Sequence, residues 1–450
     1  MDKNDLTQGS ITGKLLRFFF PVLLGMLFQQ LYNTVDAIIV GNCVGPAALA
    51  AVGGSPAVII NLVIGFFTGL ASGATVIISQ FFGSHDEERL SRAEHTVVTF
   101  CLLIGAVLTV LGWFSAEWSL RLVKTPADIL ADSRRYLQIY YLGTIPLLLF
   151  NVGSGILRAI GDSRWPLVFL GVCCVLNVFL DLLFVAAFSW GVVGVGWATV
   201  ISLLVSAVCV LLHLMRLDNA CRLELQRLGI HLPSLRRILY IGVPSGIQSA
   251  MYSISNLIIQ SAVNAFGTTV VAAWTAMGKF DGLYWVTSNS FGITICTFVG
   301  QCYGAGLLDR MKIGIRKWLL VMVLSSAGLS VVLLGLAPWG LRLFTSDAAV
   351  LDEAIRLLWY FMPFYAVWAF IEILSNAMRG AGDSVTPMLI CLVGVCLLRI
   401  LWIAIAVPVR NIIATVCLAY PITWCVAALA FIWYYRRGAW MKHGLAVQHT

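Results

Sequence analysis

Long apolar runs follow one another along almost the whole chain and are separated by short polar connections. A helix that crosses a bilayer needs about 20 mostly apolar residues, and a strand or a core helix of a soluble domain needs fewer. The pattern therefore predicts twelve transmembrane helices. They cover residues 15–40, 55–81, 96–115, 137–157, 166–187, 193–215, 238–262, 280–301, 317–337, 357–378, 387–408 and 412–435.

The composition supports a bilayer environment. Of the 450 residues, 60% are hydrophobic and only 11% are charged, whereas soluble domains carry about 25% charged residues. The mean hydropathy is +0.91. The twelve cysteines lie mostly within apolar runs and show neither a C-x-x-C pair nor a metal spacing. The expected fold is an all-α membrane protein that contacts membrane lipid and needs no cofactor.

The basic residues predict the orientation of the helices. If both termini are cytoplasmic, most of the 29 lysines and arginines fall on the cytoplasmic side, as the positive-inside rule requires. Basic loops that face anionic lipid also explain the net charge of +8, so no nucleic-acid partner is expected. The polar N-terminus "MDKNDLTQGSITGKLL" shows no cleavable signal peptide.

Two similar six-residue motifs occur in the chain. "RAIGDS" begins at Arg158 and "RGAGDS" begins at Arg379, 221 positions later, and "SQFFG" at 79–83 matches "GQCYG" at 300–304 with the same spacing. The chain therefore divides into homologous halves, 1–215 and 237–450, joined by a basic cytoplasmic linker, 216–236. Because each half has an even number of predicted helices, the halves are parallel repeats about an axis along the membrane normal.

Each copy of the six-residue motif is predicted to form a cytoplasmic turn after the fourth helix of its half. Glycine permits a tight turn, Asp and Ser can cap the next helix, and Pro166 or Pro387 suits its first turn. The alternative to a purely structural turn is that the motif binds substrate directly. Two such halves can rock against one another and expose a central cavity to each side in turn.

Four polar residues of the first half are predicted to share one depth in the membrane. Asp36 lies in the outer part of the first helix, Asn177 and Asp181 lie on one face of the fifth, and Thr199 lies about two turns into the sixth. Two carboxylates, an amide and a hydroxyl form a candidate site for sodium or a proton. The alternative is that both carboxylates only hold helices together. The second half has apolar residues at the equivalent positions, namely Leu257 or Ile259, Leu398 and Trp402.

The second half has ionisable residues of its own. Glu372 and Arg399 both fall inside predicted spans, where they either form a buried ion pair or leave Glu372 free to contact a cationic substrate. Asp281 stands near the edge of its predicted span, beside Lys279, and solvation is expected to account for it.

Several of these segments resemble one family. The first helix "FFFPVLLGMLFQQLYNTVDAIIVG", the "SQFFG" segment, "LRAIGDS" and "MRGAGDS" resemble the multidrug and toxic compound extrusion (MATE) family over essentially the whole chain, and "VDAIIVG" resembles its DinF-like prokaryotic branch. The resemblance implies two six-helix bundles in a prokaryotic cytoplasmic (inner) membrane. It also implies export of amphipathic, often cationic organic compounds by antiport with sodium or protons.

The resemblance also assigns roles to residues. Asp36, Asn177, Asp181 and Thr199 match the cation site of DinF-like members, and Pro21 matches the proline at which the first helix bends. A NorM-like site in the second half is not expected, because the seventh helix "VPSGIQSAMYSISNLIIQSAV" carries no acid. Polar and aromatic side chains of the spans are candidate substrate ligands, with helix-to-helix hydrogen bonding or an interface position as the alternatives. They are Gln29, Asn33, Gln248, Asn256, Tyr284 and Glu372.

The leading hypothesis is thus a cation-coupled exporter, expected to be a monomer. A flippase of lipid-linked or polysaccharide precursors is the alternative, but it needs a basic cavity for pyrophosphate, and Arg399 is the one basic residue well inside a span. A receptor or scaffold would not need polar groups at matched depth. No nucleotide-binding loop and no hydrolase motif occur in the sequence, so neither ATP hydrolysis nor an enzyme is expected.

Overall fold

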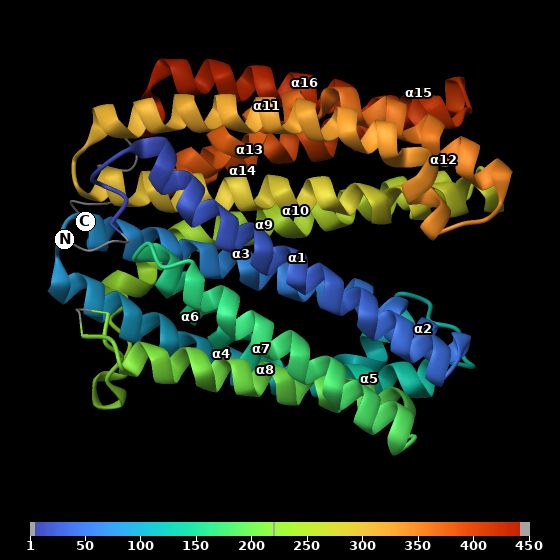
Figure 1. The fold of residues 1–450 in the computed structure, drawn as a ribbon, viewed down its shortest axis with the longest axis horizontal. Helices are drawn as coiled ribbons and strands as arrows, with labels where there is room; N and C mark the ends of the chain where they lie inside the picture. Colours follow the sequence, from blue (N-terminus) through green and yellow to red (C-terminus); the bar gives the residue numbers. More distant parts are fainter. Residues whose placement is uncertain (1–4, 219–220, 442–450) are drawn as a thin grey trace. The chain divides into compact units, whose positions relative to one another are not determined.

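The computed structural model describes residues 5–218 and 221–441, and every regular element within them is helical (Figure 1). The first half contains α1 (Ile11–Cys43), α2 (Pro46–Gly53), α3 (Ser55–Gly83), α4 (Glu87–Leu122), α5 (Leu130–Leu142), α6 (Thr144–Ala159), α7 (Arg164–Asp181), the π-helix η1 (Leu182–Ala187) and α8 (Gly191–Met215). A short 3₁₀ turn, η2 (Leu225–Arg227), interrupts the linker.

The second half repeats this order. It contains α9 (Leu232–Asn264), α10 (Thr268–Gly304), α11 (Leu308–Gly340), η3 (Leu341–Leu343), α12 (Ala348–Phe361), η4 (Met362–Phe364), α13 (Tyr365–Gly380), α14 (Val385–Cys391), the π-helix η5 (Leu392–Leu397), α15 (Leu398–Val409) and α16 (Ile413–Arg437). Apart from residue 412 and the turn residue Gly143, each of the twelve predicted spans lies within these helices, so the all-α membrane architecture is confirmed.

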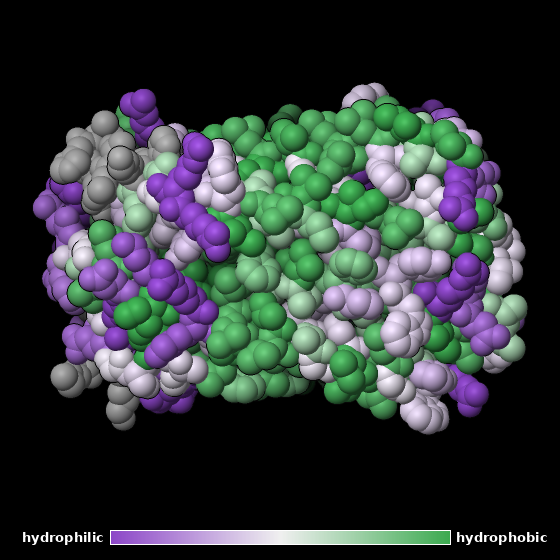
Figure 2. All heavy atoms as spheres, turned by 90° about the horizontal axis from the view of Figure 1, so that it is seen from above, coloured by the Kyte–Doolittle hydropathy of each residue, from purple (hydrophilic) through white to green (hydrophobic). Residues whose placement is uncertain are grey.

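Length and composition identify the spans to different degrees. Nine helical segments of the described chain are long and apolar enough to cross a membrane, and the pair α5 and α6, bent by 48°, makes a tenth. The long helices α9 and α10 carry more polar residues and fail this test of composition. On the face seen in Figure 2, hydrophobic side chains cover the middle of the helices and hydrophilic ones gather toward their ends, as expected for helices in lipid.

The chain packs as two compact units. Among the described residues, unit 1 contains residue 5 and residues 20–218 and 221–243, and unit 2 contains residues 6–19 and 244–441. These boundaries differ from the repeat halves 1–215 and 237–450, because the chain changes unit inside α1 and inside α9. Both changes fall next to a proline within the helix, Pro21 or Pro244, where one backbone hydrogen bond is missing.

In unit 1, the start of α9 packs closely against α3. A methyl group added to Gly73 of α3 would lie 2.5 Å from the carbonyl oxygen of Ile238 and 2.7 Å from the Cα of Gly242. Only a residue without a side chain allows the two backbones to approach so closely. This contact assigns the first turns of α9 to unit 1.

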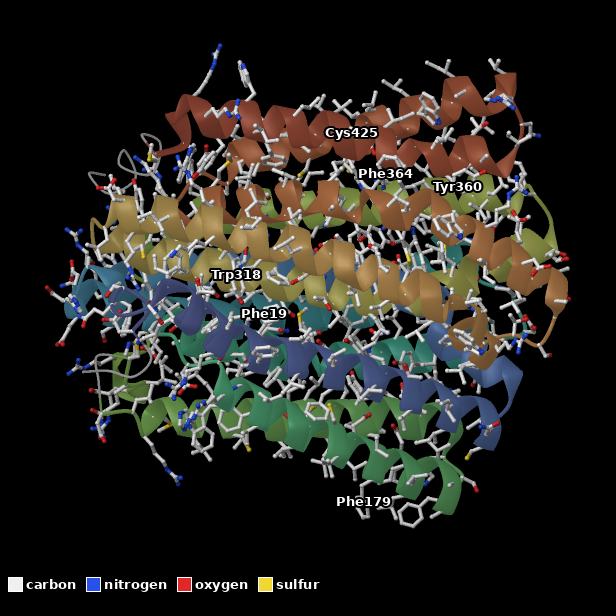
Figure 3. The ribbon with its side chains drawn as sticks, turned by 45° about the horizontal axis from the view of Figure 1, so that its top comes forward. Phe19, Phe179, Trp318, Tyr360, Phe364 and Cys425 are labelled. Carbon is white, nitrogen blue, oxygen red and sulfur yellow. The ribbon has the colours of Figure 1, made fainter. Side chains whose placement is uncertain are left out.

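In unit 2, the start of α1 packs against the second half of the sequence. The ring of Phe19 lies 4.4 Å from that of Phe291 in α10 and 5.6 Å from that of Trp318 in α11 (Figure 3). Trp318 is fully buried, and its indole nitrogen donates a hydrogen bond to the Phe291 carbonyl. These aromatic contacts explain why residues 6–19 belong to unit 2.

The six-residue motif forms the same turn in both units, as predicted. Gly161 and Gly382 have φ angles of +87° and +103°. Asp162 accepts a hydrogen bond from the Arg164 amide at 3.0 Å, and Asp383 accepts one from the Thr386 amide at 3.2 Å. The aspartates therefore satisfy free amides at the start of α7 and α14.

The linker is attached to the start of α4 within unit 1. The Glu224 amide donates to Nε2 of His95 at 3.0 Å, and the His231 amide donates to the Thr96 hydroxyl at 3.1 Å. His95 is buried. Cys221 of the linker is also buried, and burial, followed by the charge of Glu94, raises the pKa of its thiol well above the usual value.

Candidate cation site in unit 1

Three helices of unit 1 supply the four predicted cation-site residues. Asp36 lies on α1, Asn177 and Asp181 lie one turn apart on α7, and Thr199 lies on α8, which packs along α7. Asp181 is the last residue of α7 before the chain continues as the π-helix η1. Such wide turns change the direction of side chains and are frequent at functional sites.

The four side chains are largely removed from solvent. Asn177 and Asp181 are fully buried, and Thr199 is 7% exposed. Asp36 is half-buried, but its Oδ1 atom is inaccessible. A carboxylate in such surroundings needs a donor, a cation or a proton.

The carboxyl groups of Asp36 and Asp181 are direct neighbours, close enough to share a hydrogen bond if one is protonated. Ionised carboxylates can only accept. Among the described residues, no donor reaches Oδ1 of Asp36 or either carboxyl oxygen of Asp181. Among the described residues, neither aspartate forms an ion pair with a basic side chain. Two neighbouring carboxylates without a hydrogen-bond donor therefore need a bound proton or cation to balance their charges.

The neighbouring groups fit a small hard cation. Both amide atoms of Asn177 are buried without a hydrogen-bond partner, and the Thr199 hydroxyl donates to the Val195 carbonyl at 3.0 Å, which leaves its lone pairs free. Carboxylate, amide and hydroxyl oxygens suit hard cations. No group of three or more His, Cys, Asp or Glu residues that could hold a metal occurs in the described part of the chain.

Tyrosines around the carboxylates were missed by the sequence analysis. Tyr136 of α5 interacts electrostatically with both Asp36 and Asp181, and Tyr32 of α1 interacts with Asp36. Tyr136 and Tyr140 lie one turn apart, and Tyr136 is buried. That spacing is visible in "RRYLQIYYL", but it equally fits a membrane interface, so only packing shows what the rings face.

The candidate substrate ligands lie in different environments. Gln29 and Asn33 of unit 1 and Asn256 of unit 2 are exposed. Gln248 is buried, accepts from Arg379 at 3.1 Å and donates to the Cys391 sulfur at 3.3 Å. Tyr284 is buried too, and its hydroxyl donates to the Tyr365 carbonyl at 3.0 Å. The first three side chains are therefore exposed, whereas the buried two are held in hydrogen bonds within unit 2.

Glu372 and Arg399 do not form the ion pair that was one of two expectations. Oε1 of Glu372 accepts from the Asn376 amide at 2.8 Å, and Asn376 accepts from Arg379 at 3.2 Å. Arg399 instead lies over the Tyr420 ring, 4.0 Å from its centroid. The two residues lie on α13 and α15, and those helices turn their charged groups toward different neighbours.

Asp281 differs from its sequence-based expectation. It is 7% exposed in α10, whereas Lys279 two residues earlier is exposed. Its carboxylate accepts hydrogen bonds from Nε1 of Trp285 at 2.7 Å and from the Tyr365 hydroxyl. Solvation therefore does not account for this carboxylate.

Comparisons with known proteins agree with this architecture. The family model described as MatE matches residues 21–183 and again residues 244–405, once in each half. Two Bacillus subtilis relatives are similar over nearly their full length. The probable multidrug resistance protein YpnP is 26% identical over 98% of both chains, and the probable multidrug resistance protein YoeA is 28% identical over 96% of this chain and 94% of its own.

Solved structures show the same fold. A MOP superfamily transporter from Pyrococcus furiosus has a TM-score of 0.91 with 23% identity, covering 98% of this chain and 99% of its own. An outward-facing multidrug resistance MATE family transporter has a TM-score of 0.90 with 23% identity, covering 100% of this chain and 99% of its own.

Proposed function

Because this chain belongs to the MatE family, whose members are transporters, we propose that it exports small amphipathic organic compounds in exchange for sodium or protons. The family expected from the sequence is thereby confirmed, and the chain is a multi-pass membrane protein. Antiport, the coupling ion and the preference for cationic compounds belong to the proposal. So do the location in the prokaryotic inner membrane and the cytoplasmic termini.

The observation that carries the proposal is the pair of facing carboxylates in unit 1. Asp36 and Asp181 are neighbours inside a membrane protein, and their buried oxygens lack donors among the described residues. Leaving two unpaired charges there would be costly. A sodium ion or a proton removes that penalty when it binds and restores it when it leaves, which gives the protein two states of different energy.

The geometry indicates how ion binding could act on the helices. The ligands come from α1, α7 and α8, so a cation that gathers them shifts these three helices toward one another. We propose that an ion arriving from outside makes this shift and drives release of the substrate outward. Pro21 lies within α1, and its missing backbone hydrogen bond gives that helix a place to bend.

Transport by purified protein in liposomes tests the proposal. Efflux of an organic cation should follow an imposed sodium or pH gradient, and the effective gradient identifies the ion. Asp36→Asn and Asp181→Asn should each abolish coupled efflux. Asp128→Asn is the matched control, because Asp128 is exposed in the connection after α4. Full coupled efflux in both site variants would refute the role of the carboxylates.

The same liposomes separate an exporter from a flippase. A flippase would move a labelled pyrophosphate-linked lipid between leaflets and leave the organic cation in place. Arg399, the basic residue well inside a span, is engaged with the Tyr420 ring. Because Arg399 is also only 3% exposed, a pyrophosphate group does not reach it, so we expect no lipid movement.

A further inference from the structure

Asp281 is a second buried carboxylate that the proposed cation site does not use. It lies in α10 of unit 2, apart in the sequence from all four residues of that site. One carboxyl oxygen accepts from the Tyr365 hydroxyl of α13, and the other accepts from Nε1 of Trp285 at 2.7 Å. Both donors are neutral, so neither balances the charge of the carboxylate.

No basic side chain pairs with this carboxylate. Within the described chain, no ion pair includes Asp281. Arg399 lies over the Tyr420 ring, and Tyr420 interacts electrostatically with both Arg399 and Asp281. Arg399 is thus engaged with the Tyr420 ring and does not pair with Asp281.

Aromatic rings enclose the carboxylate. Tyr284 stacks on Tyr365 with ring centroids 3.8 Å apart, and the Trp285 ring lies 5.1 Å from that of Trp368 and 6.3 Å from that of Trp424. The indole nitrogen of Trp424 is buried and has no hydrogen-bond partner among the described residues. Such surroundings favour a neutral acid over an isolated charge.

A proton fits this enclosure better than a metal ion does. Hard cations such as calcium and magnesium take about six or more oxygen ligands, whereas an indole offers none. A protonated carboxyl needs only one acceptor, and the Tyr365 hydroxyl can accept as well as donate. Reversing that one hydrogen bond accommodates both protonation states of Asp281.

We propose that Asp281 takes up and releases a proton during the transport cycle, so that unit 2 holds a proton site of its own. The inference rests on the proposed cation-coupled export and deepens it. In the protonated state Asp281 donates to the Tyr365 oxygen, and in the ionised state Tyr365 donates to Asp281. In the protonated state the hydrogen of the Tyr365 hydroxyl no longer points at Asp281 and turns toward another acceptor.

The ionisable groups around Asp281 are few. Tyr284 lies on the same helix as Asp281, Tyr365 interacts with Asp281 from α13, and Tyr420 interacts with it from α16. Arg399 of α15 lies over the Tyr420 ring. Glu372 lies further along α13 and also interacts with Tyr284. Burial disfavours a charge on Asp281, whereas the hydrogen bonds that Tyr365 and Trp285 donate stabilise it. Opposing influences of this kind allow a switch.

Infrared difference spectroscopy of the full chain in lipid vesicles reads this proton directly. The spectrum between acidic and alkaline pH should show a carbonyl band of a protonated buried carboxyl. Asp36 and Asp181 can contribute to the same spectral region, so we expect Asp281→Asn to remove one component of that band. It should persist in Asp352→Asn, the matched control, because Asp352 is an exposed acid of the same unit. A band whose components are all unchanged in Asp281→Asn overturns the proposal, as does the absence of the band from the native protein.

A second variant guards against misfolding of the first. Tyr365→Phe keeps the ring stack on Tyr284 and removes only the hydroxyl. The Asp281 band should then move to higher frequency, because a carboxyl that loses a hydrogen bond has a stiffer carbonyl. An unmoved band would show that Tyr365 is not the proton partner and would refute the exchange.

The spectra also separate this inference from the proposed function. The double variant Asp36→Asn with Asp181→Asn should lose coupled efflux yet keep the Asp281 band. If the native protein shows the band but no coupled efflux, the proposed function fails and the proton site stands. If coupled efflux is normal in Asp281→Asn and keeps its native pH dependence, the proton does not belong to the transport cycle and the inference fails.

Discussion

The buried amide of Asn177 offers a test of the cation site that does not depend on transport. Its side chain is fully buried, and neither amide atom has a hydrogen-bond partner among the described residues. Asn177→Leu replaces this amide by an apolar group of similar volume. The effect on stability should therefore depend on whether the ion is present.

The structure sets the size of the effect. A buried polar group without a partner destabilises a protein by about 1–3 kcal/mol, so without the ion the variant should be more stable by that amount. An ion at 100 times its dissociation constant stabilises the native protein by about 2.7 kcal/mol. Each tenfold loss of affinity in the variant removes about 1.4 kcal/mol of this gain. Saturating ion should thus reduce or reverse the advantage of Asn177→Leu.

The assay is thermal unfolding of the purified chain, with sodium titrated at fixed pH and with pH varied in the absence of sodium. Asn151→Leu is the matched control. Asn151 lies on α6 of the same unit, and its amide already donates to the Leu147 carbonyl at 3.0 Å. That variant should keep the full stabilisation by the ion.

Two results would refute the reasoning. If stabilisation by the ion is unchanged in Asn177→Leu, the amide is not a ligand of the ion. If the variant is strongly destabilised without the ion, the native amide has a partner that the cation-site geometry does not include. Either result would remove Asn177 from the site and leave Asp36 and Asp181 to be judged by transport alone.

Three further predictions concern packing and turns. Gly73→Ala should destabilise unit 1 by about 1–3 kcal/mol, because the methyl group meets the backbone of Gly242; an unchanged unfolding temperature would contradict this contact. Thr96→Val removes the acceptor of the His231 amide, so the linker should loosen and its buried, high-pKa thiol should alkylate faster, as measured by mass spectrometry of the linker peptide. Gly382→Ala should cost about 1–2 kcal/mol at its positive φ, and equal stability would show that the turn can relax.

The four candidate cation-site residues of unit 1 show which contacts sequence spacing can predict. Asn177 and Asp181 are four residues apart on a helix and must share a face, so their proximity follows from sequence alone. That Asp36 is the direct neighbour of Asp181 depends on how α1 packs against α7. The role of these residues in binding an ion stays a prediction, and Tyr136 entered the site only through the packing of α5.

In unit 2, sequence spacing did not predict which groups the charged side chains contact. Glu372 and Arg399 were candidates for one ion pair because both are charges inside spans, yet each contacts other groups. Asp281 was expected near solvent because of its position close to a span edge and to Lys279. The contacts of these side chains depend on which face of each helix packs against its neighbours. A single charged residue in a span does not indicate that face.

The sequence by itself determined the twelve spans, the repeat and the repeated turn. These follow from the length of apolar runs and from local backbone chemistry, which are independent of which helices meet. The tertiary structure alone decided that α1 and α9 are each divided between two units, and that aromatic side chains from α10, α13 and α16 surround Asp281. Contacts between helices far apart in the chain depend on the shapes of both faces, and no local pattern specifies them.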